Sequence, residues 1–162
     1  MSEKKKSATN RNPSTKKAAK KLCFVCTGNT CRSPIAEAVM KSYLAVIGLS
    51  KAVKPESAGL AVVPDSVLSP YARAIFKKYQ FRNQTRKAVQ FTPSMIEEYD
   101  LIVTMTAEQK DAIGRYPNIY CFHDVTGRGD VPDPYGGTSA DYEAVTRYFI
   151  SAMDDVMRYL RI

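Results

Sequence analysis

The sequence predicts an α/β protein in which one four-stranded parallel sheet carries helices on both faces. Short apolar runs alternate with longer segments of helical periodicity, which is the pattern of successive β-α-β units. At 162 residues, the chain has the length of one ordinary domain. Hydrophobic residues make up 44% of it, as in soluble globular proteins. No apolar run approaches the ~20 residues of a membrane-spanning helix, so we expect a single soluble domain.

Positive charge is concentrated at the start of the chain. Residues 1–21 hold eight Lys or Arg and one Glu, and so carry seven of the eight net positive charges. This segment has too few apolar side chains to build a core. We expect residues 1–21 to be a disordered, solvated tail and residues 22–162 to be the folded domain. Weak attraction to nucleic acid or anionic lipid is the alternative role for the tail. The domain itself is almost neutral, so neither nucleic acid nor a membrane is an expected partner.

The first half of the domain is predicted to contain two strands and two helices. Apolar runs mark the strands, and apolar residues three or four apart mark the helices. Gly48 is a typical stop for the first helix, and Pro70 is a typical start for the second. The expected elements are a strand at 22–26, a helix at 34–47, a strand at 52–57 that ends at Ala58-Gly59, and a helix within 66–79.

The second half is predicted to alternate in the same way. Leu101–Met105 is a continuous apolar run, which is typical of a parallel strand buried on both faces. The segment from His123 to Gly137 holds four Gly, two Pro and three Asp, and is expected to be a loop. The other expected elements are a short capped helix at 92–97, a helix at 107–113, a strand at 119–122 and a long helix at 139–160.

The segment Cys26-Thr27-Gly28-Asn29-Thr30-Cys31-Arg32-Ser33-Pro34 joins the first strand to the first helix. Backbone N–H groups of such a turn converge on one point, where the helix dipole adds partial positive charge. The turn is therefore expected to bind an anion of phosphate shape, with Arg32 contacting two of its oxygens. In this field Cys26 is favoured as a thiolate nucleophile, which the Ser33 hydroxyl helps to hold. The expected phosphate- and substrate-binding residues of the turn are Thr27, Gly28, Asn29, Thr30, Cys31 and Ser33.

A cysteine that attacks phosphorus also needs an acid to protonate the leaving group. Asp133 follows the last predicted strand, at the carboxyl edge of the sheet where the phosphate turn also lies. Pro134 stiffens the backbone beside it, and Tyr135 is placed to face a flat substrate side chain. Cys26, Arg32 and Asp133 are therefore the expected catalytic residues.

These motifs resemble those of the low-molecular-weight protein tyrosine phosphatase family. Its hallmark is a Cys, five residues and an Arg followed by Ser-Pro, with an Asp-Pro-aromatic motif near the end; Cys26, Arg32 and Asp133 match position by position. The resemblance spans residues 22–162. It implies a protein phosphatase that forms a phosphocysteine intermediate, uses Asp133 as acid and then base, and needs neither metal nor cofactor. Phosphorylated proteins are then the partners, and inorganic phosphate is a product.

Thr30 departs from the family's usual turn, in which a branched apolar residue occupies this place. The turn with Thr30, together with the run from Gly129 to Gly137, resembles the bacterial protein arginine phosphatase subgroup. A guanidinium that enters the pocket can donate a hydrogen bond to the Thr30 hydroxyl, whereas an apolar side chain at this position would leave the guanidinium N–H groups unpaired. Phosphoarginine is therefore the favoured substrate, and phosphotyrosine is the alternative.

The resemblance also implies residues that brace the turn. Ser57 matches a family serine and is expected to reach the turn through Asn29. Family members often carry a histidine near the start of the second helix that supports the turn. Tyr71 stands at the apparent equivalent place, so this support is expected to be missing. The pair of adjacent tyrosines of eukaryotic members is also absent.

Two other functions that use such a turn are disfavoured. Arsenate reductases share it but need two further cysteines after the third strand, where this chain has Thr104-Met105-Thr106. A non-catalytic phosphate-binding module would lack Cys26, Arg32 or Asp133. His123, the single histidine, has no partner in the sequence and is expected at the surface.

The four cysteines, without a secretory signal, indicate reduced thiols and a cytoplasmic location. Cys23 and Cys26 have the spacing of a redox pair, but strand-forming residues separate them, so Cys23 is expected in the core. A zinc site built on these two and Cys31 lacks a fourth ligand. Cys31 is expected either to pack under the turn or, as we favour, to protect Cys26 through a reversible disulfide.

Overall fold

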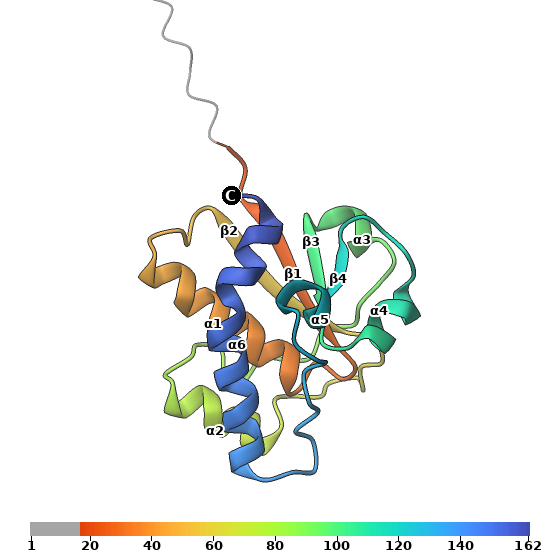
Figure 1. The fold of residues 1–162 in the computed structure, drawn as a ribbon. Coiled ribbons are helices and arrows are strands. Elements are labelled where there is room, and N and C mark those ends of the chain that lie inside the picture. Colours follow the sequence, from red (N-terminus) through yellow and green to blue (C-terminus); the bar gives the residue numbers. More distant parts are fainter. Residues whose placement is uncertain (1–16) are drawn as a thin grey trace, which may run out of the picture.

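The computed structural model describes residues 17–162, so most of the expected basic tail lies outside the described residues. The strands and helices follow the predicted order, with one additional short helix after the last strand (Figure 1). No helix in the described part is long and apolar enough to cross a bilayer. The elements are β1 (Lys20–Cys26), α1 (Arg32–Val46), β2 (Val53–Gly59), α2 (Pro70–Lys78), α3 (Met95–Glu98), β3 (Leu101–Thr104), α4 (Ala107–Ile113), β4 (Ile119–Cys121), α5 (Phe122–Thr126) and α6 (Ser139–Leu160).

The four strands are parallel and form one sheet in the order β2-β1-β3-β4. The central strand β1 pairs with β2 along its whole length, so that Cys26 lies beside Gly59. Parallel strands all end at the same edge of a sheet, and the loops that follow them are therefore brought together. This edge receives the phosphate turn after β1 and the long loop after β4.

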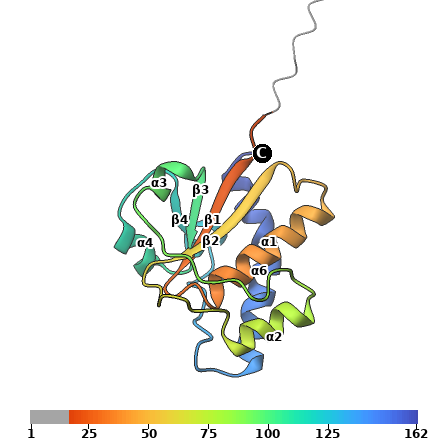
Figure 2. The same ribbon diagram turned by 180° about the vertical axis from the view of Figure 1, so that it is seen from behind.

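Helices cover both faces of the sheet (Figures 1 and 2). One core packs α1, α2, α5 and α6 against it, and a smaller core packs α3 and α4 against the other face. Successive residues of β1 enter the two cores in turn: Phe24 contributes to the first, and Cys23 and Val25 contribute to the second. All three are fully buried, which explains why the strand is apolar from Leu22 to its end at Cys26.

Two elements, β1 and the short helix before β3, begin at residues other than those expected. β1 begins at Lys20 rather than at residue 22, because the Lys20 N–H donates to the Ala52 carbonyl at 2.9 Å. The Lys21 N–H donates to Asp100 Oδ2 at 2.7 Å. The short helix before β3 begins at Met95, and no side-chain bond caps it, so the capped helix expected at 92–97 is shorter than its sequence pattern suggests.

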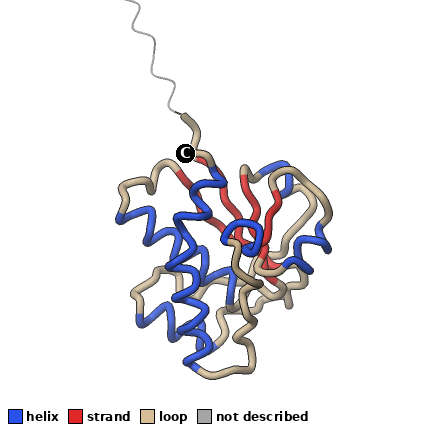
Figure 3. Tube along the Cα trace, viewed as in Figure 1, coloured by secondary structure: helices blue, strands red, loops and turns tan. Residues whose placement is uncertain are grey.

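The segment expected to be a loop from His123 onward is partly helical. Phe122–Thr126 form α5, and the preceding strand therefore ends at Cys121 (Figure 3). Asp124 Oδ2 accepts the Cys121 N–H at 3.0 Å and so caps the helix. Gly127, with a φ of 70°, ends it in the left-handed conformation. The glycine- and proline-rich composition describes only the part of the segment after this helix.

Candidate active site

A cavity of about 570 Å³ opens where the turn after β1 meets the N-terminus of α1. Both expected motifs reach it, although they come from opposite ends of the domain. They meet because each lies in a loop that follows a parallel strand, and these loops emerge at the same edge of the sheet. The expected residues that line the cavity are Cys26, Thr27, Gly28, Thr30, Cys31, Arg32, Asp133 and Tyr135. Two others, Asn29 and Ser33, are buried within the turn instead.

Cys26 ends β1 and is only 3% exposed. Its sulfur lies 2.8 Å from Ser33 Oγ and accepts the backbone N–H of Asn29 at 3.2 Å. Both groups can donate to a thiolate sulfur, which can only accept hydrogen bonds. The local geometry thus suits a nucleophilic thiolate at the floor of the cavity.

Asn29 is the internal brace of the turn. It adopts a left-handed φ of 54°, which Asn tolerates better than most residues. Its Nδ2 donates to Ser33 Oγ at 2.7 Å and to Ser57 Oγ at 3.0 Å, so the expected contact with Ser57 is present. Because the Ser33 oxygen accepts this bond, its own proton is free to point at the Cys26 sulfur.

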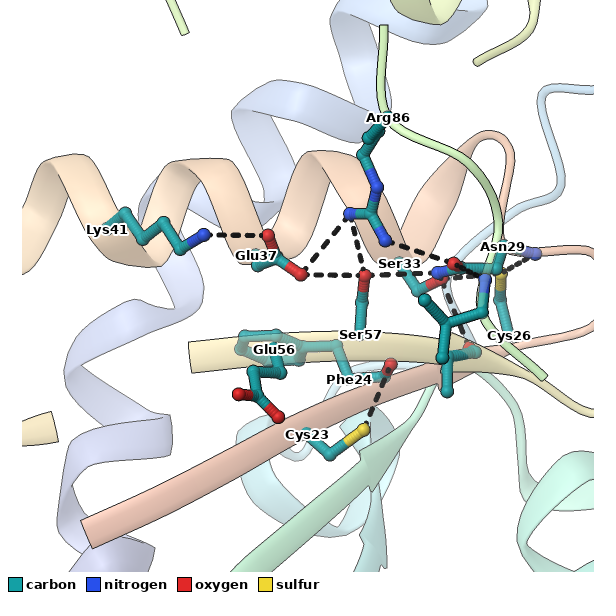
Figure 4. A network of polar contacts seen from close by, with 12 residues as sticks. Cys23, Phe24, Cys26, Asn29, Ser33, Glu37, Lys41, Glu56, Ser57 and Arg86 are labelled. Carbon is teal, nitrogen blue, oxygen red and sulfur yellow. Dashed lines mark hydrogen bonds and ion pairs between the residues drawn. The ribbon is translucent and has the colours of Figure 1, made fainter. Parts of the chain in front are cut away.

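Arg86 supplies the outer support that the sequence suggested was missing (Figure 4). Its Nη2 donates to Asn29 Oδ1 at 3.1 Å, and its Nη1 donates to Ser57 Oγ at 3.0 Å. The same Nη1 pairs with Glu37 Oε1 at 3.2 Å. Tyr71 itself gives no support to the turn, as expected, because its side chain is 46% exposed and packs against the ring of Tyr142. A lone arginine in an irregular segment carries no motif, so sequence reasoning missed it.

Arg32 joins the turn to the loop that carries Asp133. Its Nη1 donates to the Val131 carbonyl at 2.9 Å, and its Nη2 lies 3.6 Å from Asp133 Oδ2. Arg32 is buried, whereas the Asp133 side chain is 59% exposed. The other oxygen of Asp133 accepts the Tyr135 N–H at 3.1 Å. The carboxyl group is therefore held at the cavity mouth, open to a leaving group or water.

Cys31 contacts the opposite wall of the cavity. Its thiol donates to Ser69 Oγ at 3.2 Å, and its sulfur lies 3.3 Å from the Tyr142 hydroxyl. Burial, followed by the hydrogen bond with Cys31, raises the pKa of Tyr142 to about 12, so this hydroxyl stays neutral at physiological pH. Cys31 thus packs beneath the turn, and its protective disulfide with Cys26 stays a prediction.

Two residues considered from the sequence lie away from the cavity. Cys23 is fully buried in β1, and burial raises the pKa of its thiol well above the usual range. His123 is exposed in α5, with Nδ1 2.5 Å from the Arg128 carbonyl oxygen. Neither lines the cavity, in agreement with the roles expected for them.

The cavity brings together a buried cysteine with hydrogen-bond partners at its sulfur, an arginine at the end of the turn and an aspartic acid. These are the groups that a phosphatase needs to transfer a phosphoryl group through cysteine. The profile of the low molecular weight phosphotyrosine protein phosphatase family matches residues 21–161. The chain belongs to this family and is a cysteine-dependent protein phosphatase.

Relatives of two named specificities are similar to this chain. A protein-arginine-phosphatase of Bacillus subtilis (strain 168) is 38% identical over 147 residues, which cover 86% of this chain and 93% of the relative. The protein-tyrosine-phosphatase PtpB of Staphylococcus aureus is 34% identical over 127 residues, which cover 75% and 86%. A structure of the YwlE arginine phosphatase, a mutant with a phosphorylated active-site serine, superimposes with a TM-score of 0.77 at 31% identity, covering 87% of this chain and 95% of the other.

Proposed function

We propose that this phosphatase hydrolyses phosphoarginine in proteins, with phosphotyrosine as the alternative substrate. The observation that carries the proposal is Thr30, whose side chain lines the cavity. Its hydroxyl has one weak contact within the described residues, with the Cys31 sulfur at 3.7 Å, and so is available to a ligand. A guanidinium brings several N–H donors that need acceptors, and the aryl ring of phosphotyrosine brings none.

The proposed reaction has two steps. The Cys26 sulfur attacks phosphorus, the S–P bond forms, and the bond from phosphorus to the bridging nitrogen breaks as Asp133 protonates that nitrogen. Water then attacks the phosphocysteine, gives its proton to Asp133, and releases inorganic phosphate and the free cysteine. Arg32 and the backbone N–H groups of the turn hold the phosphoryl oxygens in both steps. Neither a metal nor a cofactor has a role.

The proposed roles of Ser33, Gly28 and Tyr135 follow from their positions around the cavity. Ser33 stabilises the thiolate, and Gly28 allows the backbone to approach the phosphoryl group closely. Tyr135 is 76% exposed at the cavity mouth, where its ring can cover a flat substrate group. The proposed partners are phosphorylated proteins of the cytoplasm, a location supported by four free cysteines.

The substrate is tested by kcat/KM on matched phosphoarginine and phosphotyrosine peptides. We expect the wild-type protein to prefer phosphoarginine, and Thr30→Ile to shift the ratio toward phosphotyrosine by about tenfold or more, because the guanidinium loses an acceptor. Thr30→Ser, which keeps the hydroxyl, is the matched control and should keep the preference. If the wild-type protein prefers phosphotyrosine, phosphoarginine is not the main substrate and the alternative holds.

A further inference from the structure

Gln109 connects α4 to the phosphate turn. Its Nε2 donates to Thr27 Oγ1 at 3.1 Å, across 82 residues of sequence. Gln109 is buried, with 7% of its surface exposed, whereas Thr27 is exposed and lines the cavity next to Cys26. A buried amide on one element therefore contacts the first residue after the proposed nucleophile.

The direction of this hydrogen bond is determined by the other end of the amide. Gln109 Oε1 accepts the backbone N–H groups of Met105 at 3.0 Å and Thr106 at 3.2 Å. Backbone N–H groups only donate, so the amide oxygen must face them and the amide nitrogen must face Thr27. The Gln109 N–H in turn donates to Thr106 Oγ1 at 3.1 Å, which completes a capping box on α4. The glutamine cannot flip without breaking two hydrogen bonds.

The Thr27 hydroxyl is consequently an acceptor toward Gln109 and has its own proton left to donate. Within residues 17–162, Thr27 Oγ1 has no other hydrogen-bond partner. The Thr27 carbonyl accepts the Ala61 N–H at 2.9 Å, which fixes the backbone of this residue. The proton is therefore available to whatever occupies the cavity, and the oxygens of a phosphoryl group are strong acceptors.

We propose that Gln109 is a positioning residue, which holds the Thr27 hydroxyl as a hydrogen-bond donor to an oxygen of the bound phosphoryl group. The inference rests on the proposed chemistry at Cys26. It does not depend on whether arginine or tyrosine carries the phosphoryl group, because the contact is made to the phosphoryl oxygens that both share.

The test uses Gln109→Glu, which preserves the size of the side chain and the oxygen that caps α4. The variant replaces the amide donor by a second acceptor, so the Thr27 proton turns toward α4 and leaves the cavity. With p-nitrophenyl phosphate as the probe, we expect kcat to fall about tenfold and KM to change little. The loss is smaller than that for a buried oxyanion donor because Thr27 is exposed to solvent. Thr27→Val should cause a similar loss, and Thr27→Ser should recover most of it.

The double variant separates this role from an effect of the added charge. If Gln109→Glu acts through the hydroxyl, it has no further effect in the Thr27→Val background. An equal loss in both backgrounds, or no loss in the wild-type background, overturns the inference. Denaturant unfolding of each variant shows whether a loss of fold is responsible, and Thr27→Val tests the same donor at an exposed position. Failure of the proposed function would give a different result from failure of this inference, because the wild-type protein would then hydrolyse the aryl phosphate and not phosphoarginine.

Discussion

Arg86 Nη2 donates to Asn29 Oδ1 at 3.1 Å, and this contact determines how the Asn29 amide is oriented beside Cys26. A guanidinium only donates, so the amide oxygen of Asn29 faces it and also accepts the Val89 N–H at 2.9 Å. The amide nitrogen must then face Ser33, whose own proton can point at the Cys26 sulfur at 2.8 Å or at the more distant Ala58 carbonyl at 3.4 Å. One donor outside the turn thus orients the Asn29 amide, which contacts Ser33 beside the Cys26 sulfur (Figure 4).

Removal of the Arg86 guanidinium should weaken both catalysis and the fold. In Arg86→Leu, we expect kcat to fall about tenfold because Asn29 loses its orientation. The free energy of unfolding should fall by about 3 kcal/mol, since Glu37, only 13% exposed, loses a buried partner. Steady-state kinetics and urea unfolding measure the two effects. Arg82→Leu, an exposed neighbour, is the control, and an equal loss there would contradict the assignment.

Replacement of Arg86 by histidine should introduce a dependence on pH. An imidazole is charged below roughly pH 6.5 and neutral above it, so only the protonated form can pair with Glu37 as the guanidinium does. The activity of Arg86→His relative to the wild-type protein should therefore fall as pH rises from 5.5 to about 7.5. A flat ratio across this range of pH–rate profiles would show that the charge at this position does not matter.

Substitutions of the proposed nucleophile, Cys26, and of the proposed acid, Asp133, should affect turnover in different ways. Cys26→Ser should abolish turnover and still bind inorganic phosphate, because the turn and Arg32 remain. Asp133→Ala should slow turnover by about 10²-fold or more, the usual contribution of a general acid. Quenched-flow mass spectrometry should detect phosphocysteine where its hydrolysis becomes slow. Asp65→Asn, whose side chain is 81% exposed, is the control; normal turnover by Cys26→Ser would refute the mechanism.

Gly59 should be intolerant of any side chain. A Cβ there would lie 2.6 Å from the Thr27 carbonyl oxygen and 2.9 Å from the Asn29 nitrogen, both backbone atoms of the phosphate turn. Gly59→Ala should therefore displace the turn, lowering kcat by more than tenfold and stability by about 2 kcal/mol. Gly129→Ala, where a Cβ would meet nothing within 4 Å, is the control. Wild-type activity of Gly59→Ala would mean that the turn is not tightly packed.

Glu143 should contribute to stability in a pH-dependent way. The hydrogen bond from Tyr79, helped by Lys78 at 3.0 Å, holds the pKa of Glu143 below its ordinary value. A carboxylate with a lowered folded pKa stabilises the fold above its unfolded pKa, and the contribution is lost as pH falls through the folded value. Glu143→Gln should therefore lose less unfolding free energy than the wild-type protein between pH 7 and about pH 3. Equal losses in denaturant titrations would exclude this contribution.

Local patterns predicted most of the fold because each element carries its own signal. β3 was recognisable because both of its faces are buried, so three of its four residues, Leu101–Val103, are apolar. α4 was predicted over its full length, Ala107–Ile113. The motif around Cys26 was recognisable because a phosphate turn needs its residues at consecutive positions. The start of β1 depends on a hydrogen bond between residues far apart in the chain, Lys20 and Ala52, so the local sequence pattern did not predict it.

The sequence by itself determined the class of fold, the phosphate turn and the aspartic acid that faces it, since each depends on a short run of residues. Only the tertiary structure decided how the turn is held. Arg86 lies 57 residues from Asn29, and Gln109 lies 82 residues from Thr27. Each is a single polar residue with no neighbouring motif, and its role exists only because parallel strands bring distant loops to one edge. The orientation of a hydrogen bond depends on both of its partners, and distant partners meet only in the folded chain.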